Sequence, residues 1–225
     1  AKSDQPTSLL GQLGDAPTKP QLDKRISDPK SNCNARRLEH WCSLESEPKT
    51  LFGYPEWLLR PIVRTKPKKG RPGPRPFNSV QAQRMELPIV LADTAGVTIE
   101  GLRIRISAWE NRQMDDITAT LECLAPEQWV CISRVDFLPP APHGNKHWKR
   151  YRLDPEVFGS HLHACADNAR IGGSAFTPEE NLPNAVPLVS EPQSFRDICR
   201  MLEEVWNVDG LLTLPSPDWK GGLLC

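Results

Sequence analysis

Two histidines and a cysteine alternate along one short segment, at His161, His163 and Cys165. Alternate side chains of a β-strand point to the same face and lie about 7 Å apart. Imidazole nitrogens and thiolates are preferred zinc ligands, so this spacing has the outline of a metal site. Two imidazoles on one face also suit acid–base cleavage of a phosphodiester. The structural alternative is a pair of histidines on the wet face of a strand, with no cofactor, and this is our expectation.

Two further histidines precede this segment. His143 and His147 could approach the same face if residues 146–153 form a strand that pairs with it. They would then complete either a zinc site or a pair of acid–base imidazoles.

The seven cysteines are an odd number at irregular spacing, which favours buried free thiols over a disulfide framework. Cys33, His40 and Cys42 could donate metal ligands, but eight residues between the cysteines exceed the short spacing of zinc fingers and ribbons. The chain has no Gly-x-x-x-x-Gly-Lys-Ser/Thr, Gly-x-Gly-x-x-Gly, His-Glu-x-x-His or Gly-x-Ser-x-Gly motif. The enzyme classes marked by these motifs are therefore disfavoured.

The clearest local signal is a basic, proline-rich stretch between Arg60 and Arg84. It contains eight basic residues and no acidic one. The prolines that interrupt it are Pro61, Pro67, Pro72, Pro74 and Pro76. Proline blocks both helix and central strand, so the stretch is expected to be extended. A cationic extended peptide favours nucleic acid, because each phosphate that it neutralises releases counterions.

Residues 66–76 of this stretch resemble the AT-hook family, through the core Gly70-Arg71-Pro72 with basic flanks. The resemblance implies an extended peptide in a narrow minor groove, with Arg71 inserted toward its floor. Gly70 would allow close approach, Pro72 would direct the chain, and the flanking Lys68, Lys69 and Arg75 would meet phosphates. The chain departs from the family after Pro72, where Gly73-Pro74 precedes the next basic residue. The alternative without nucleic-acid binding is a solvated linker or a protein-binding polyproline segment.

Hydrophobic alternation with a period of two begins after the basic stretch. Leu102, Ile104 and Ile106 alternate with arginines, which is typical of a half-buried antiparallel strand. The expected strands are residues 102–108, 117–123, 129–137, 146–153 and 160–165.

One helix is expected near the C-terminus. Ser194 can cap it with Asp197 three residues later, and apolar residues follow at helical spacing as far as Asn207. The fold class is therefore α+β, a curved antiparallel sheet with one C-terminal covering helix. We expect three segments: a flexible, extended arm over residues 1–50, a tether and basic hook over 51–84, and the β domain over 85–225.

The C-terminal third resembles uncharacterised proteins of bacterial prophages and integrative elements. The residues that carry this resemblance are Gly159-Ser160-His161-Leu162-His163, the helix 195–207 and the tail 211–219. It implies a bacterial or phage cytosol and an accessory role in element maintenance, defence or counter-defence.

Composition excludes other classes. The longest apolar runs are far shorter than the ~20 residues of a membrane span, and no signal-peptide core is seen, so a cytoplasmic protein without membrane partners is expected. The formal net charge is +0, so only local charge can select a partner.

These patterns together predict a non-enzymatic protein that binds nucleic acid or joins a nucleoprotein complex. The expected contact residues are Arg64, Lys66, Lys68, Lys69, Gly70, Arg71, Pro72, Arg75, Arg103, Arg105, Trp148, Lys149, Arg150, Tyr151 and Arg152. One alternative is a small nuclease or toxin that depends on the histidines or on a metal. The other is an adaptor that binds a protein partner through its N-terminal arm and its acidic C-terminal helix, without nucleic acid.

Overall fold

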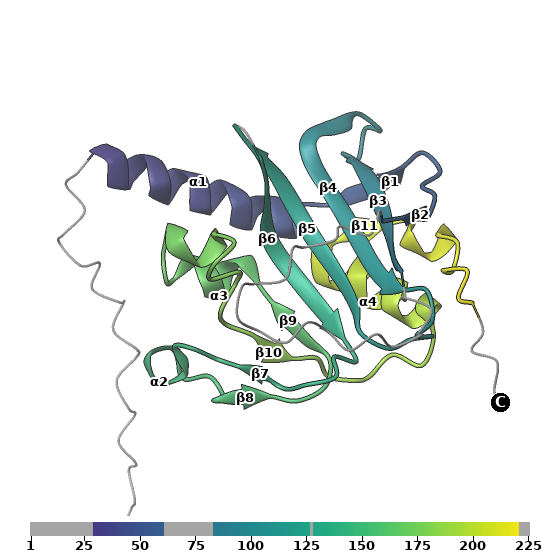
Figure 1. Ribbon diagram of the computed structural model, residues 1–225. Helices are drawn as coiled ribbons and strands as arrows, with labels where there is room; N and C mark the ends of the chain where they lie inside the picture. The colour runs from purple at the N-terminus through teal and green to yellow at the C-terminus, as the bar shows by residue number, and fades with distance from the viewer. Residues whose placement is uncertain (1–28, 61–82, 127, 221–225) are drawn as a thin grey trace, which may run out of the picture.

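The structure is a computed structural model that describes residues 29–60, 83–126 and 128–220 (Figure 1). Residues 1–28 of the expected arm lie outside the described residues. The hook between residues 61 and 82 lies outside them as well, so the AT-hook prediction has no structural counterpart here.

One large sheet organises the described chain, in the strand order β10-β9-β6-β5-β4-β3-β1-β11, with β2 also paired to β3. All pairs are antiparallel except that of β1 with β11. Its strands are β1 (Lys49–Phe52), β2 (Leu58–Leu59), β3 (Arg84–Ala92), β4 (Thr98–Trp109), β5 (Ile117–Ala125), β6 (Gln128–Phe137), β9 (His161–His163), β10 (Val186–Pro187) and β11 (Val208–Asp209). A separate two-stranded sheet joins β7 (His143–Gly144) to β8 (Glu156–Val157). The expected α+β class with a mainly antiparallel sheet is confirmed.

The long central strands form where the sequence alternates. Ile104 of β4 lies opposite Ile89 of β3 and Leu121 of β5, and all three side chains are fully buried. The intervening arginines point to the other face, so one face of each strand builds the core and the other stays polar. The predicted strands 102–108, 117–123 and 129–137 correspond to β4, β5 and β6.

The predicted strand over residues 146–153 is wrong. This segment contains the short helix α2 (Trp148–Tyr151), which ends at Arg152 in the left-handed region with φ of 57°. β9, with which it was expected to pair, is flanked by β6 on one side and by β10 on the other. The segment therefore has no strand to pair with.

The covering helix is α4 (Phe195–Trp206), and it begins where the sequence predicts. The Ser194 hydroxyl accepts a hydrogen bond from the Asp197 backbone N–H at 3.1 Å, which satisfies one of the free donors of the first turn. One face of α4 is buried against the sheet, with Ile198, Leu202 and Trp206 at its centre. The remaining helical elements are α1 (Pro29–Ser46), α3 (Cys165–Ala169), η1 (Gly173–Phe176) and η2 (Leu211–Thr213).

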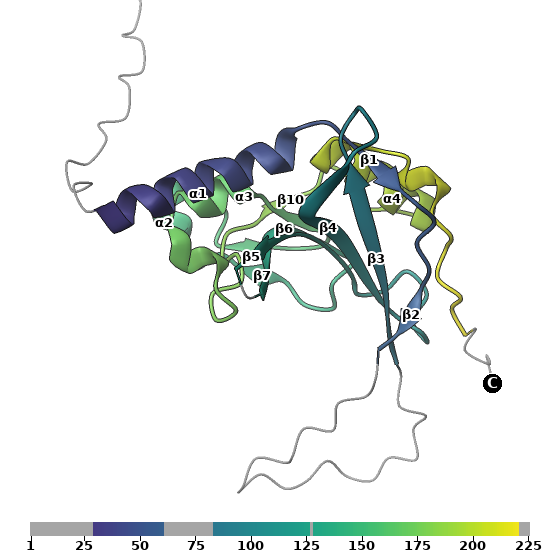
Figure 2. The same ribbon diagram turned by 90° about the horizontal axis from the view of Figure 1, so that it is seen from above.

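The prediction of a flexible arm over residues 1–50 is wrong for the part that forms helix α1. α1 lies over the same side of the sheet as α4 (Figures 1 and 2), and Trp41 and Leu44 are each only 8% exposed. The Trp41 ring packs 5.2 Å from that of Phe176. Lys49 ends this region with its side chain buried, donating to the Leu44 carbonyl at 2.8 Å. Residues 35–50 are therefore part of the packed body, because the apolar face of the helix finds a surface that the sequence alone does not reveal.

In the described part of the chain no helix combines the length and the apolar character needed to cross a membrane.

Candidate metal centre

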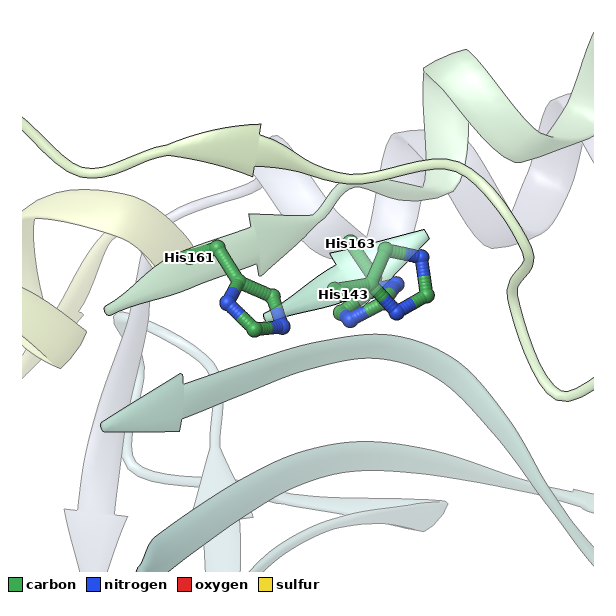
Figure 3. A group of neighbouring side chains, drawn as sticks. All are labelled: His143, His161 and His163. Atoms are coloured by element: carbon green, nitrogen blue, oxygen red, sulfur yellow. The ribbon is translucent and has the colours of Figure 1, made fainter. Parts of the chain in front are cut away.

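Three histidines from two different strands meet beside the sheet edge (Figure 3). His161 and His163 alternate on β9 and share one face, as the spacing predicts. The β7–β8 hairpin brings His143 against them, with its ring centroid 5.3 Å from that of His161 and 4.5 Å from that of His163. One nitrogen of each ring lies within 4.8 Å of the corresponding nitrogens of the other two. The three side chains are thus close enough to hold one metal ion.

Each ring is oriented by a backbone carbonyl. His163 Nδ1 lies 2.6 Å from the Leu182 oxygen, and His161 Nδ1 lies 2.8 Å from the Gly159 oxygen. His143 uses its other nitrogen, with Nε2 3.1 Å from the Pro183 oxygen. A carbonyl only accepts, so these three nitrogens carry the hydrogens. A metal would bind the second nitrogen of each ring, as is usual for histidine ligands, and for His161 and His163 that nitrogen, Nε2, faces Asp136 in the metal-free chain.

Two buried asparagines fix the segment that supplies two of these carbonyls. Asn145 accepts from the Ala185 N–H at 2.7 Å and donates to the Ala185 oxygen at 2.9 Å. Asn168 makes the same pair of contacts with Asn184, both at 2.9 Å. Each amide replaces a strand partner for this backbone, so the Leu182 and Pro183 carbonyls have little freedom to move.

An arginine and an aspartate of β6 lie directly beneath the rings. Arg134 pairs with His163 across the strands, and Asp136 pairs with His161. Asp136 Oδ2 is 3.4 Å from His161 Nε2, 3.3 Å from His163 Nε2 and 2.9 Å from Arg134 Nε. Arg134 Nη2 also approaches His163 Nε2 at 2.8 Å. A carboxylate and a guanidinium therefore meet the histidine nitrogens at one point.

Burial and these neighbours set the protonation states. Burial lowers the pKa of His163 to about 4, a shift that the Arg134 charge supports and Asp136 opposes. Burial also lowers the pKa of His143. For Asp136, burial alone would raise the pKa, but the contacts with His161 and His163 and the charge of Arg134 bring it below its ordinary value. At neutral pH His143 and His163 are therefore neutral and Asp136 is ionised, which is the state that metal binding requires of these groups.

A hollow of about 620 Å³ opens beside His143. Its walls include Asn145, Lys146, Trp148 and Glu180. Lys146 is paired with Glu180 at 2.6 Å, so the hollow carries charges of both signs. His161 and His163 are 2% and 0% exposed, so His143 is the member of the group that faces this hollow.

Three of the candidate ligands, Cys165, His147 and His40, lie outside the histidine group. Cys165 is the first residue of α3, because β9 ends at His163 and the alternation stops there. Its Sγ lies 3.1 Å from Cys42 Sγ instead. His147 precedes α2, and its ring packs 6.3 Å from that of Tyr151. The His40 side chain is exposed on α1, whereas that of Cys42 is half-buried.

The expected nucleic-acid contacts fall into three groups. On the polar face of the sheet, Arg103 pairs with Glu122 at 2.7 Å, and Arg105 bridges Glu122 and Glu86, so these charges are already balanced. The hook residues Arg64, Lys66, Lys68, Lys69, Gly70, Arg71, Pro72 and Arg75 lie outside the described residues.

The third group lies on and just after α2. Lys149, Arg150 and Arg152 are exposed, and Trp148 is 38% exposed. Tyr151 is buried with its hydroxyl donating to the Arg170 oxygen at 2.9 Å, so it offers no stacking face.

Sequence reasoning missed His143 as a firm member of the site and missed Arg134 and Asp136 altogether. The signal for Arg134 and Asp136 was the alternation of charged with apolar residues along β6. This alternation identifies the polar face of the strand, but it does not show which strand pairs with it.

Comparison of the chain with protein-family models, with curated proteins and with solved structures found no match.

Proposed function

We propose that this protein binds one divalent transition-metal ion, of the zinc class, through His143, His161 and His163. The observation that supports this most directly is the combination of convergence and orientation. One nitrogen of each ring lies within 4.8 Å of a nitrogen of each other ring, and every ring has a nitrogen hydrogen-bonded to a backbone carbonyl, as metal-binding histidines usually do.

The donor set favours a hydrolytic centre over a purely structural one. Structural zinc sites use four protein ligands and are rich in cysteine, whereas three histidines leave a position for water. Held by these histidines, such an ion would lower the pKa of a bound water to about 7 and so supply a nucleophile at neutral pH. Asp136 lies beside the same nitrogens and is ionised, so its negative charge would favour a cation at this point. The hollow beside His143 gives a substrate room to approach.

Metal analysis of the full chain tests this proposal. After removal of metal with a chelator and reloading with zinc, we expect about one ion per chain to survive gel filtration. His163→Ala should lose it, and His143→Ala, at a more exposed ring, provides a second variant if the first does not fold. His147→Ala is the matched control, since that ring lies outside the group, and it should retain the metal. Absence of stoichiometric zinc in the wild-type chain would refute the proposal.

Nucleic-acid binding is the second candidate function, and the exposed cations at α2 favour it. Lys149, Arg150 and Arg152 flank Trp148, whose ring borders the hollow beside His143. Cations meet phosphates and an exposed indole can stack on a base, so this surface could present a strand to the metal centre. The sheet arginines Arg103 and Arg105 contribute less, because their charges are balanced by Glu122 and Glu86.

Salt-dependent binding to single-stranded DNA, duplex DNA and RNA tests this second function. Replacing Lys149, Arg150 and Arg152 by Ala should flatten the plot of log affinity against log salt by about 2 to 3 units if all three meet phosphates. The Lys68, Lys69 and Arg71 triple variant tests the hook in the same assay. Arg103→Ala is the control and should leave the slope almost unchanged. An unaltered slope in both triple variants would remove nucleic acid as the partner of these residues.

A further inference from the structure

Two thiols that are far apart in the sequence face each other across the contact between α1 and α3. Cys42 Sγ and Cys165 Sγ are 3.1 Å apart, although the residues are 123 positions apart in the chain. Cys42 is half-buried and Cys165 is fully buried. Neither residue belongs to the histidine group, and the pair has no part in the function proposed above.

The backbone around the pair is held from both sides. The Cys165 N–H lies 3.1 Å from each carboxylate oxygen of Glu45, which is one turn after Cys42 on α1. Trp41, the neighbour of Cys42, is packed against Phe176 on the body. The two elements are thus fixed relative to each other before any bond forms between the sulfur atoms.

A disulfide requires sulfur atoms about 2.05 Å apart, so this pair needs to close by only about 1 Å. The distance between the sulfur atoms is therefore compatible with a disulfide. The sequence did not indicate this link, because it suggested Cys42 and Cys165 as ligands of two different metal sites.

We propose that Cys42 and Cys165 form an intramolecular disulfide when the protein meets a small-molecule disulfide such as oxidised glutathione. The Cys42 thiolate, which solvent reaches first, attacks one sulfur of the reagent, forms a mixed disulfide and releases one reduced thiol. The Cys165 thiolate then attacks the Cys42 sulfur and releases the second. The two protein thiols lose two electrons to the reagent, and their protons end on the two released thiols.

The link would join α1 to the residues that directly follow β9. The loop that it closes contains every strand from β1 to β9, and with them all three histidines. Crosslinking a loop of this length restricts mainly the unfolded chain, so oxidation should stabilise the fold. The cysteine pair would thus be an oxidative modification site that crosslinks α1 to the segment next to the histidines.

Oxidation of the full chain with excess oxidised glutathione, compared with the reduced chain, tests the proposal. We expect the count of free thiols in denaturant to fall by two. Peptide mapping without reductant should give one crosslinked species containing Cys42 and Cys165. The melting temperature should rise by roughly 5–15 °C and return to its starting value after reduction.

Two variants separate this link from unspecific oxidation. Cys42→Ser should show no intramolecular crosslink and no rise in melting temperature on oxidation. Cys123→Ser, at a half-buried cysteine of β5, should behave as the wild-type chain does. Crosslinks to other cysteines, disulfide-linked dimers in place of the intramolecular bond, or an unchanged thiol count would each overturn the proposal. The wild-type peptide map decides the matter even if Cys42→Ser does not fold.

Discussion

Replacing Arg134 by Met should tighten metal binding at the histidine centre. In the metal-free protein the Arg134 guanidinium approaches His163 Nε2 at 2.8 Å and pairs with Asp136 at 2.9 Å. The positively charged guanidinium therefore lies where a metal ion would bind. A metal ion must displace it from His163, and the variant removes that competitor.

The size of the effect follows from the contacts that are lost. A hydrogen bond to a charged group contributes about 1.5 to 3 kcal/mol, and every 1.4 kcal/mol is tenfold in affinity. The Arg134 side chain is only 12% exposed, so solvent does little to replace the contact. We therefore expect zinc to bind Arg134→Met roughly 10- to 100-fold more tightly than the wild-type chain.

Competition with a chromophoric zinc chelator measures the change. Arg103→Met is the matched control, since it removes a paired arginine from the same sheet face at a distance from the histidines, and its affinity should stay close to wild type. A thermal melt of each variant excludes unfolding as the cause. Unchanged or weaker zinc binding in Arg134→Met would refute the view that the guanidinium competes for the site.

Two further predictions concern the fold. Ser194→Ala should lower the free energy of unfolding by about 1 kcal/mol and Ser194→Asp should restore most of it, as measured in urea, because the Ser194 hydroxyl caps α4. Burial lowers the pKa of Lys49 to about 8, against the opposing charges of Glu47 and Glu45, so between pH 8 and about 10.4 the unfolded chain holds a proton that the folded chain has lost. The free energy of unfolding of the wild-type chain, minus that of Lys49→Met, should therefore rise by up to about 3 kcal/mol across this pH range. If this difference does not change with pH, the pKa of Lys49 is not lowered.

The central strands and α4 could be predicted because their local signals agree with their burial. Leu102, Ile104 and Ile106 alternate with arginines, and Ser194 marks the start of a helix with one apolar face. A short helix over residues 34–42 could be suspected from the sequence, but its length and its packing on the body could not. Its polar sequence offers few apolar residues, and the burial of Trp41 depends on Phe176, which lies far away in the chain. Tertiary contacts of this kind override local composition.

The candidate site was accessible to sequence reasoning only in part. The spacing of His161 and His163 places both on one face of any strand, so their proximity follows from local geometry. His143 joins them through the β7–β8 hairpin, whereas Arg134 and Asp136 meet them through the pairing of β6 with β9. Register between distant strands cannot be read from one alternating pattern, because every strand of that period offers the same two faces.

X-ray absorption spectroscopy of the zinc-loaded full chain tests the central claim most directly, since it reports the atoms bound to the metal. Coordination by His143, His161 and His163 predicts three imidazole nitrogens at about 2.0–2.1 Å, remaining ligation by oxygen, and no sulfur. His147→Ala should leave this spectrum unchanged. Sulfur at about 2.3 Å, or zinc with fewer than two imidazoles, would contradict a centre built from these three histidines.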